Sequence, residues 1–390
     1  MPGQQVDYTM NNTPSPQVHV CIATGQNAAN FIPLQQYGAK EVWILQTPSM
    51  KSSADNLALA LRQDGRRIER KPFDDSSPMA MARSAESIAE QLDGRQVVLH
   101  ATGGTKLMVL ALRDGLRLVE AGEGRLDILY AETLKQQVDW LGAQPRTEPM
   151  ADVLDLQKML LVQGYRIDGD NRHAAAQQRA QTRATLTRKL GENAASYGKS
   201  FSALAVLAVR AAVEGAAARE LTQMFQYSPG GRVAEMLKDA QSHGLLRWDG
   251  EDTVNFESTE AARYLAGGWI EEFVLLKLTG MFTPGRFSSN LNVLSAGGGV
   301  PNELDAMVVH RNRALFIECK TGRQSNPAAA FYKLAQLRDR LGGSVAAALY
   351  LSAQRLGDEH RQRADEYRID VLCGDDVAKL PAWLRGWKGG

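Results

Sequence analysis

Cysteine is scarce in this chain of 390 residues: there are three, Cys21, Cys319 and Cys373, and they lie far apart. An odd number of scattered cysteines excludes a disulfide framework and argues against a zinc site. We therefore expect a protein of the reducing cytoplasm.

Long apolar runs and a strong net charge are also missing. No hydrophobic stretch approaches the ~20 residues that a membrane span needs, and residues 1–16 carry no signal-peptide core. The formal net charge is +1, so contact with nucleic acid would depend on local basic patches rather than on a field from the whole chain. A hydrophobic content of 44% is ordinary for a soluble globular protein.

The chain is long enough for two or three domains, and its pattern changes character twice. We expect boundaries that give residues 1–148, 149–266 and 267–390. The first part alternates strands and helices, which predicts a mostly parallel, doubly wound α/β sheet. Strands are expected at 18–23, 41–46, 66–73 and 96–100, with a closing hairpin at 126–130 and 137–141.

Ligands bind such sheets beyond the carboxyl ends of the strands, where three polar loops fall. The candidate ligand-binding residues are Thr24, Gly25, Gln26 and Asn27, then Thr47, Pro48 and Ser49, and finally Thr102, Gly103, Gly104, Thr105 and Lys106. In the last loop, glycines let backbone N–H groups approach a ligand, and the following helix presents a positive dipole end suited to phosphate. A tight turn explains the glycines, but not the hydroxyls and the cation beside them. The loop is neither a Walker A nor a GxGxxG motif, so it predicts a phosphate-bearing ligand without NTP hydrolysis or dinucleotide binding.

A hairpin pattern in the last part places two acidic residues opposite each other. Apolar strands are expected at 302–310 and 313–320, joined by a two-residue turn at Arg311 and Asn312. Counting back from that turn pairs Asp305 with Glu318. Two like charges repel at the ~4.5–5.5 Å between the Cβ atoms of such a pair. Stability alone does not favour this arrangement.

A divalent cation between the two carboxylates would turn the repulsion into a binding site. Strand alternation puts Lys320 on the same face as Glu318. The metal ligands that we predict are Asp305, Glu318 and the backbone carbonyl of Cys319, and the catalytic residues are Asp305, Glu318 and Lys320. Such a site activates water for phosphodiester hydrolysis, with the lysine offsetting the developing negative charge. A surface hairpin with solvated charges is the plain alternative.

These three residues resemble the PD-(D/E)xK motif of restriction-endonuclease-like nucleases. The match departs mildly, because Glu303 also precedes the aspartate and Pro301 is not adjacent to it. Together with the polar loops at Thr24 and at 102–106, nearly the whole chain resembles the CRISPR-associated nucleases that join a CARF sensor domain to a restriction-endonuclease-like domain.

That resemblance implies a Rossmann-like CARF sensor first and a nuclease last. It implies a homodimer that binds a cyclic oligoadenylate, cyclic tetra-adenylate above all, as an allosteric activator. With Mn²⁺ or Mg²⁺ the nuclease would cut single-stranded DNA or RNA, or nick duplex DNA, in type III CRISPR defence. It also suggests that a glutamate of the first nuclease helix reaches the metal, and we choose Glu271 over Glu272. An ordinary acid near a helix N-terminus is the alternative.

The middle part predicts a winged-helix-like module. Helices are expected at 201–213, 217–226 and 232–243, followed by a hairpin at 245–256. The third helix balances its two cations with two acids, which favours a spacer or a dimerisation element over a DNA reader. Residues 171–191 are basic and contain no acid, which indicates an exposed connector with a solvated face.

Three other functions stay open at this stage. One is a nucleotide-switched winged-helix DNA-binding regulator with an inactive nuclease domain, which would need no metal ion. A second is a sensor that degrades its own ligand, although the loop at 102–106 lacks an evident general base. A third is a repair nuclease that needs no oligoadenylate.

Overall fold

The computed structural model describes residues 17–62, 65–121, 124–142, 144–169, 172–213, 220–322 and 326–389. The chain folds into two compact units, residues 1–153 and 154–390. No helix among the described residues is both long enough and apolar enough to cross a membrane. All three cysteines are free and buried.

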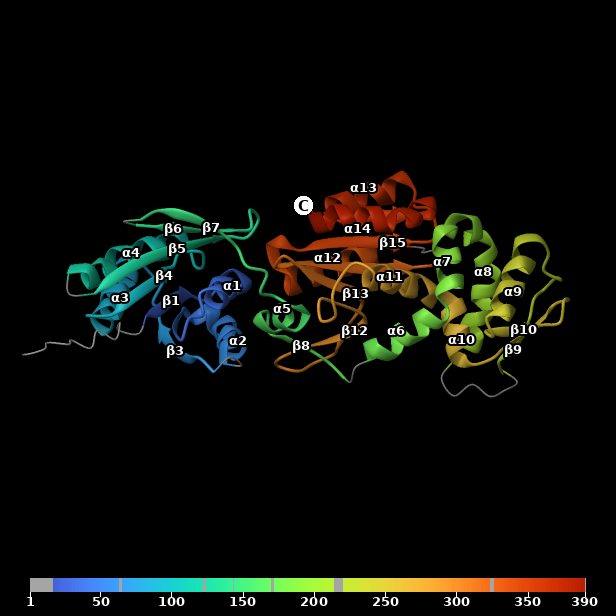
Figure 1. Ribbon diagram of the computed structural model, residues 1–390, viewed down its shortest axis with the longest axis horizontal. Helices are drawn as coiled ribbons and strands as arrows, with labels where there is room; N and C mark the ends of the chain where they lie inside the picture. Colours follow the sequence, from blue (N-terminus) through green and yellow to red (C-terminus); the bar gives the residue numbers. More distant parts are fainter. Residues whose placement is uncertain are drawn as a thin grey trace, which may run out of the picture. The chain divides into compact units, whose positions relative to one another are not determined.

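The first unit is built on a seven-stranded sheet with the order β3-β2-β1-β4-β5-β6-β7 (Figure 1). The strands are β1 (Val18–Ile22), β2 (Glu41–Gln46), β3 (Arg67–Pro72), β4 (Gln96–His100), β5 (Arg125–Glu132), β6 (Gln137–Leu141) and β7 (Arg146–Pro149). β1 to β5 are parallel, and β6 and β7 are antiparallel. The six expected strands are confirmed. β7 was not expected, because its sequence is polar and ends in a proline, as suits an edge strand.

Helices cover both faces of this sheet, as the alternating pattern predicts. They are α1 (Ala28–Gln36), α2 (Lys51–Arg62), α3 (Pro78–Gln91) and α4 (Lys106–Ala121). Buried residues of α3 and α4 pack with β1, β2 and β4 in one apolar core. The strand order reverses between β1 and β4, and the loops that follow these strands therefore flank a crevice.

The second unit contains a six-stranded sheet with the order β16-β15-β14-β13-β12-β8. Its strands are β8 (Tyr165–Ile167), β12 (Phe287–Ser295), β13 (Asn302–His310), β14 (Arg313–Lys320), β15 (Ala347–Ser352) and β16 (Asp370–Cys373). β14, β15 and β16 are parallel, and the remaining pairs are antiparallel. α11 (Trp269–Thr279) shares a core with one face, and α12 (Pro327–Leu341) packs Phe331 against Tyr350. The unit also contains α5 (Leu156–Val162), α13 (Asp358–Glu366) and α14 (Leu380–Gly389).

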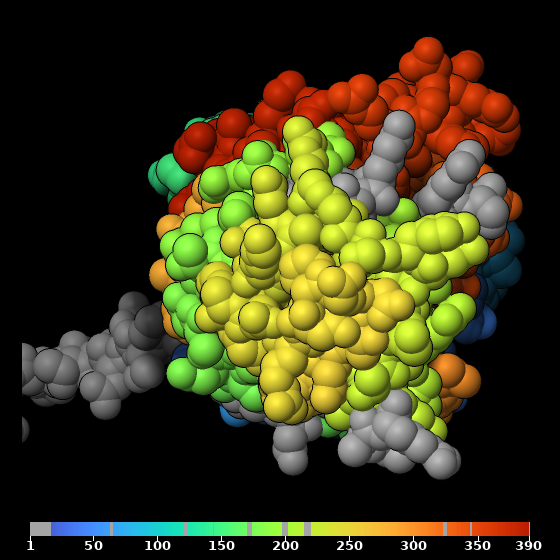
Figure 2. All heavy atoms as spheres, turned by 90° about the vertical axis from the view of Figure 1, so that its right-hand side faces the viewer, coloured from blue at the N-terminus to red at the C-terminus, as the bar shows by residue number. Residues whose placement is uncertain are grey.

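The middle segment is winged-helix-like and shares its core with the sheet of the second unit. It comprises α6 (Arg172–Thr182), α7 (Ala184–Glu192), α8 (Ala194–Ala211), β9 (Thr222–Met224), α9 (Gly231–Ser242), β10 (Leu246–Trp248), β11 (Thr253–Phe256) and α10 (Thr259–Arg263). A π-helical turn, Tyr264–Gly268, leads from α10 into α11. Residues of this segment, coloured green to yellow, form most of the face seen in Figure 2.

Two predictions for this segment were wrong. Residues 222–224 form a strand that pairs with β11, not part of a helix at 217–226; residues 217–219 lie outside the described part. The stretch 171–191, of which the structure describes 172–191, is not an exposed connector, because α7 buries Leu186 and Leu190 in the core, and the side chain of Arg183 is buried as well. Arg183 is held there by Glu260 and Glu272, which lie far away in the sequence.

Candidate functional site

The hairpin that carries the motif has the predicted turn and register. Arg311 and Asn312 have φ of 49° and 57°, the left-handed pair of a two-residue hairpin turn. The strands pair from His310 opposite Arg313 to Ala306 opposite Ile317. One further step along both strands sets Asp305 opposite Glu318.

The regular backbone pairing of β13 and β14 ends at Ala306 and Ile317, and the next hydrogen bond between the two strands involves a side chain. The Asp305 carboxylate accepts a hydrogen bond from the backbone N–H of Cys319, with 2.7 Å between Oδ2 and N. Lys320 Nζ lies 2.5 Å from Glu318 Oε1 and 3.9 Å from Asp305 Oδ2. The exposed fractions of these side chains are 15% for Asp305, 8% for Glu318 and 28% for Lys320. The structure therefore brings the three motif residues together in a half-buried cluster.

The two candidate glutamates, Glu271 and Glu272, both lie in the first turn of α11, and their side chains point in different directions. Glu271 faces the cluster: burial, followed by the charges of Asp305 and Glu303, raises the pKa of its carboxyl to about 8. Glu272 points away from the cluster and pairs with Arg183. Of the two, only Glu271 is positioned to act with the motif residues.

The cluster holds more negative charge than its one lysine balances. Burial and the nearby Glu318 carboxylate raise the pKa of Asp305 to about 6. Burial alone would lower the pKa of Lys320, but Glu318 and Asp305 outweigh it and raise that pKa. Ionised carboxylates at this point are costly unless a cation joins them.

A hard divalent cation suits these donors, because carboxylate oxygens are the ligands that Mg²⁺ and Mn²⁺ prefer. Among the described residues, no three His, Cys, Asp or Glu side chains converge on a ready metal site. In the conformation seen, Lys320 takes up an oxygen of Glu318. Burial raises the pKa of the Cys319 thiol well above its ordinary value, which disfavours the thiolate that would bind a metal ion and leaves the backbone carbonyl as the donor of this residue.

In the first unit, a cavity of about 240 Å³ lies beyond the ends of β1, β2 and β4. It is lined by Ala23, Thr24, Thr47, Ser49, Met50, Asp75, Gly104, Thr105 and Met108. All three predicted loops contribute to it. The lining does not include Gly25, Gln26, Asn27, Pro48, Thr102, Gly103 or Lys106. Sequence reasoning missed Asp75, which follows the polar strand β3 and had no motif to mark it.

Several of the predicted ligand residues hold the loops themselves in place. The hydroxyl of Thr102 accepts a hydrogen bond from Ala131 N at 2.7 Å, and the amide of Asn27 donates one to Ser53 O at 2.7 Å. A Cβ on Gly103 would lie 2.4 Å from the carbonyl oxygen of Ile22. This loop is therefore pressed against β1, where only glycine fits.

Lys106 and the hydroxyl of Thr105 mark the start of α4. Thr105 Oγ1 accepts from Met108 N at 3.3 Å, which caps the helix. Lys106 is exposed at the first position of α4, beside the cavity wall that Thr105 and Gly104 form. The hydroxyls of Thr24 and Ser49 also line the cavity, so it offers polar hydrogens to an anionic ligand.

Comparison with known proteins identifies the fold. Residues 258–389 match the family described as Card1-like, endonuclease domain. Can2 from Sulfobacillus thermosulfidooxidans, solved in complex with cyclic tetra-adenylate, superimposes with a TM-score of 0.77 at 22% identity, over 96% of this chain and 100% of that one. The protein VC1899 from Vibrio cholerae gives a TM-score of 0.79 at 21% identity, over 96% and 98% of the two chains.

A type III CRISPR defence DNA nuclease activated by cyclic oligoadenylate gives a TM-score of 0.52 at 18% identity, over 88% of this chain and 47% of that one. No curated protein sequence matches the chain. Residues 258–389 therefore match a Card1-like endonuclease domain, and the whole chain shares the fold of Can2 and VC1899: a Rossmann-like parallel sheet in the first unit, then a mixed α/β unit that includes a winged-helix-like segment.

Proposed function

We propose that this protein is a metal-dependent endonuclease of type III CRISPR defence that cyclic tetra-adenylate activates. The observation that carries the proposal is the convergence of Asp305, Glu318, Lys320 and Glu271 at one end of the β13–β14 hairpin. Its substrates would be single-stranded DNA or RNA, or duplex DNA that it nicks.

In this proposal Asp305, Glu318 and the carbonyl of Cys319 would hold Mn²⁺ or Mg²⁺, with the carboxylate of Glu271 beside them. The bound cation would supply a water of lowered pKa. Lys320 is tethered to Glu318 and would stabilise negative charge on the phosphate as it develops. The hydrogen bond from Cys319 N keeps the Asp305 carboxylate on the same side of the sheet as this lysine.

The sensor half of the proposal is supported by the cavity beyond β1, β2 and β4. A cyclic oligoadenylate presents a ring of phosphates, and two copies of the cavity would each take half of it in an isologous dimer. α4 carries three leucines that are more than half exposed: Leu107 (58%), Leu110 (55%) and Leu118 (54%). An apolar stripe next to the cavity suits a surface buried between two copies of the chain.

Cleavage of labelled single-stranded DNA and RNA, with Mn²⁺ and with or without cyclic tetra- or hexa-adenylate, tests the nuclease half. Asp305→Asn should abolish cleavage while cyclic tetra-adenylate still binds. Asp339→Asn, which changes an exposed carboxylate on α12, should leave cleavage unchanged. Retained cutting by Asp305→Asn would overturn the site. A protein that binds duplex DNA and never cuts would instead favour a winged-helix regulator.

Lys106→Ala tests the sensor half. Loss of this cation beside the cavity should raise the cyclic tetra-adenylate concentration needed for half-maximal activation by about 10-fold, since a charged hydrogen bond contributes roughly 1.5–3 kcal/mol. Lys135→Ala removes an exposed lysine in the β5–β6 turn and serves as the control. Equal activation curves for the two variants would remove Lys106 from the ligand site.

A further inference from the structure

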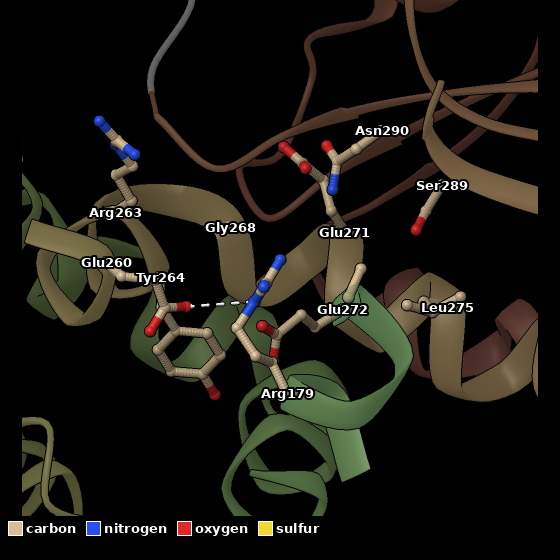
Figure 3. A pocket seen from close by; sticks show the side chains of 11 residues that line it. Arg179, Glu260, Arg263, Tyr264, Gly268, Glu271, Glu272, Leu275, Ser289 and Asn290 are labelled. Atoms are coloured by element: carbon tan, nitrogen blue, oxygen red, sulfur yellow. Dashed lines mark ion pairs between the residues drawn. The ribbon is translucent and has the colours of Figure 1, made fainter. Parts of the chain in front are cut away.

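A second cavity, of about 320 Å³, lies in the second unit and has Glu271 in its wall (Figure 3). Its walls come from α6, α10, the π-helical turn, α11 and the bend in β12. It is large enough for one nucleotide, at the small end of the ~300–1,000 Å³ usual for ligand pockets. The site proposed above does not use Arg179, Arg263 or Asn290, which all line this cavity.

Two of the residues that line this cavity lie next to the motif cluster. One of them is Glu271. Asn290 interrupts the ladder between β12 and β13: Ser289 pairs with Ala306, and Leu291 pairs with Leu304. The interruption therefore falls opposite Asp305. Asn290 has φ of 51°, which turns its side chain out of the regular alternation, and Figure 3 shows its amide beside the Glu271 carboxylate.

The other side of the cavity carries cations that are available to a ligand. Arg179, on α6, lies 3.5 Å from Glu260, and both side chains are about half exposed, at 45% and 48%. Such an exposed pair contributes only ~0–1 kcal/mol, so a phosphate can replace the glutamate at little cost. Glu260 also has a second, stronger partner in the buried Arg183, which donates two hydrogen bonds to it, of 2.8 and 3.1 Å.

Arg263, at the end of α10, lies at the mouth of the same cavity, and within the described part of the chain no ion pair or hydrogen bond of its side chain is found. The two arginines come from elements far apart in the sequence. The cavity thus has two arginines in its wall in addition to its glutamates, and the amide of Asn290, beside Glu271, offers both donors and an acceptor.

We infer that this cavity is a nucleotide subsite of the nuclease, and that α6 supplies one wall of it. It holds one nucleotide of the substrate strand next to the phosphate at the motif cluster. Arg179 and Arg263 bind the neighbouring backbone phosphate, and Asn290 contacts the base. The inference rests on the proposed nuclease function and assigns part of its substrate binding to the middle segment.

Binding of a labelled single-stranded oligonucleotide to full-length Asp305→Asn protein, with Mn²⁺ and cyclic tetra-adenylate, is the first test. Adding Arg179→Gln should weaken binding by about 10-fold and reduce the slope of log affinity against log salt by about one. Arg188→Gln, an exposed arginine on α7 that does not line the cavity, should change neither quantity. Arg179→Lys keeps the charge and should recover most of the affinity.

Cleavage kinetics with the native motif provide the second test. Arg179→Gln should raise KM more than it lowers kcat. Asn290→Ala should also raise KM, and this rise should be smaller when the substrate has an abasic position beside the scissile phosphate. If Arg179→Gln binds and cuts like Arg188→Gln, the subsite is refuted, while an inactive Asp305→Asn still supports the nuclease. If Asp305→Asn cuts, the nuclease proposal itself fails. If Arg179→Gln binds the oligonucleotide more weakly and Arg179→Lys binds it no better, the subsite is also refuted.

Discussion

At the scale of single residues, the motif cluster keeps carboxylates together at a cost to stability. Asp305 and Glu271 have pKa values raised to about 6 and about 8, by burial first and then by neighbouring acids. Their ionised forms are therefore less stable in the folded protein than in the unfolded chain. Functional sites commonly carry such a cost, because the arrangement serves a ligand rather than the fold.

Glu271→Gln should therefore stabilise the metal-free protein while it impairs cleavage. In the presence of a chelator at pH 8, we expect a gain of up to about 4 kcal/mol in the free energy of unfolding, since the pKa of Glu271 is raised from 4.5 to about 8 and one pKa unit corresponds to ~1.4 kcal/mol. Cleavage in Mn²⁺ should fall by at least about 10-fold if the carboxylate serves the cation. Thermal unfolding and a cleavage assay measure the two effects.

The neighbouring variant Glu272→Gln is the matched control, because it changes the same type of side chain one position along α11. Its carboxylate faces Arg183 instead of the acidic cluster. Burial raises the pKa of Glu272 as well, but Arg183 opposes the shift, so we expect a smaller gain in stability than from Glu271→Gln. Equal stabilisation by both variants would show that the crowding of charge at Glu271 is not the cause.

At the scale of secondary-structure elements, the β13–β14 hairpin was predictable because its register depends on local features. The apolar alternation and a two-residue turn at Arg311 and Asn312 leave one pairing that buries the apolar face. The seven-stranded sheet of the first unit was predictable for a similar reason, since β1, β2 and β4 are short apolar runs, each followed by a helix pattern.

The elements that sequence reasoning missed depend on partners far along the chain. β12 is interrupted by two serines and Asn290, so its pattern does not resemble a continuous strand. β8 and β9 have three residues each and gain their hydrogen bonds from β12 and β11. In the sequence, the basic residues of α6, α7 and Arg183 between them are typical of a solvated surface. The acids that pair with Arg183, Glu260 and Glu272, lie about 80 positions further along the chain and could not be matched to it from the sequence. The cavity that contains Arg179 could not be predicted from the sequence either, because its walls come from elements that lie far apart along the chain.

The π-helical turn before α11 gives an element-scale prediction. A Cβ on Gly267 would lie 2.6 Å from the hydroxyl oxygen of Thr321, the residue after Lys320. Gly267→Ala should therefore push the start of α11 away from the end of β14, and with it Glu271 from the motif cluster. We expect a fall in cleavage of about 10-fold or more, because small displacements at a reacting centre can cost ~100-fold.

A second substitution separates this effect from a general loss of folding. Thr321→Ala removes the hydroxyl that the new methyl group would meet, so Gly267→Ala combined with Thr321→Ala should recover much of the activity. Thr321→Ala alone serves as the reference. Cleavage rates that stay low in the double variant would mean that glycine is required at this position for another reason.

At the scale of the whole molecule, the two units should respond to acid in opposite ways. The first unit buries two histidines on neighbouring strands, His19 and His100, whose ring nitrogens lie 2.9 Å apart. Burial, and then the charge of Arg66, lowers the pKa of His19 to about 4. Burial, and then His19, lowers the pKa of His100 well below its ordinary value. The second unit instead buries acids whose pKa values are raised.

The sign of each effect follows from proton uptake. A histidine that stays neutral in the folded unit gains a proton on unfolding below its ordinary pKa of ~6.5, so stability is full above that pH and falls as the pH drops toward 4. For His19 the loss is about 2 kcal/mol at pH 5. The stability of the metal-free second unit should instead rise as the pH drops, because the folded forms of Asp305 and Glu271 take up protons between about pH 8 and pH 4.

Calorimetry in chelator, from pH 7.5 down to pH 5, tests this contrast. The unfolding temperature of the first unit should fall over this range, and that of the second unit should stay constant or rise. Hydrogen exchange of peptides from β1 and β14 shows which transition belongs to which unit. His19→Gln with His100→Gln removes the titrating groups, so the transition of the first unit should lose most of its pH dependence, whatever its absolute temperature. A first-unit transition that stays constant in the native chain over this range would mean that the histidine pair takes up protons without unfolding.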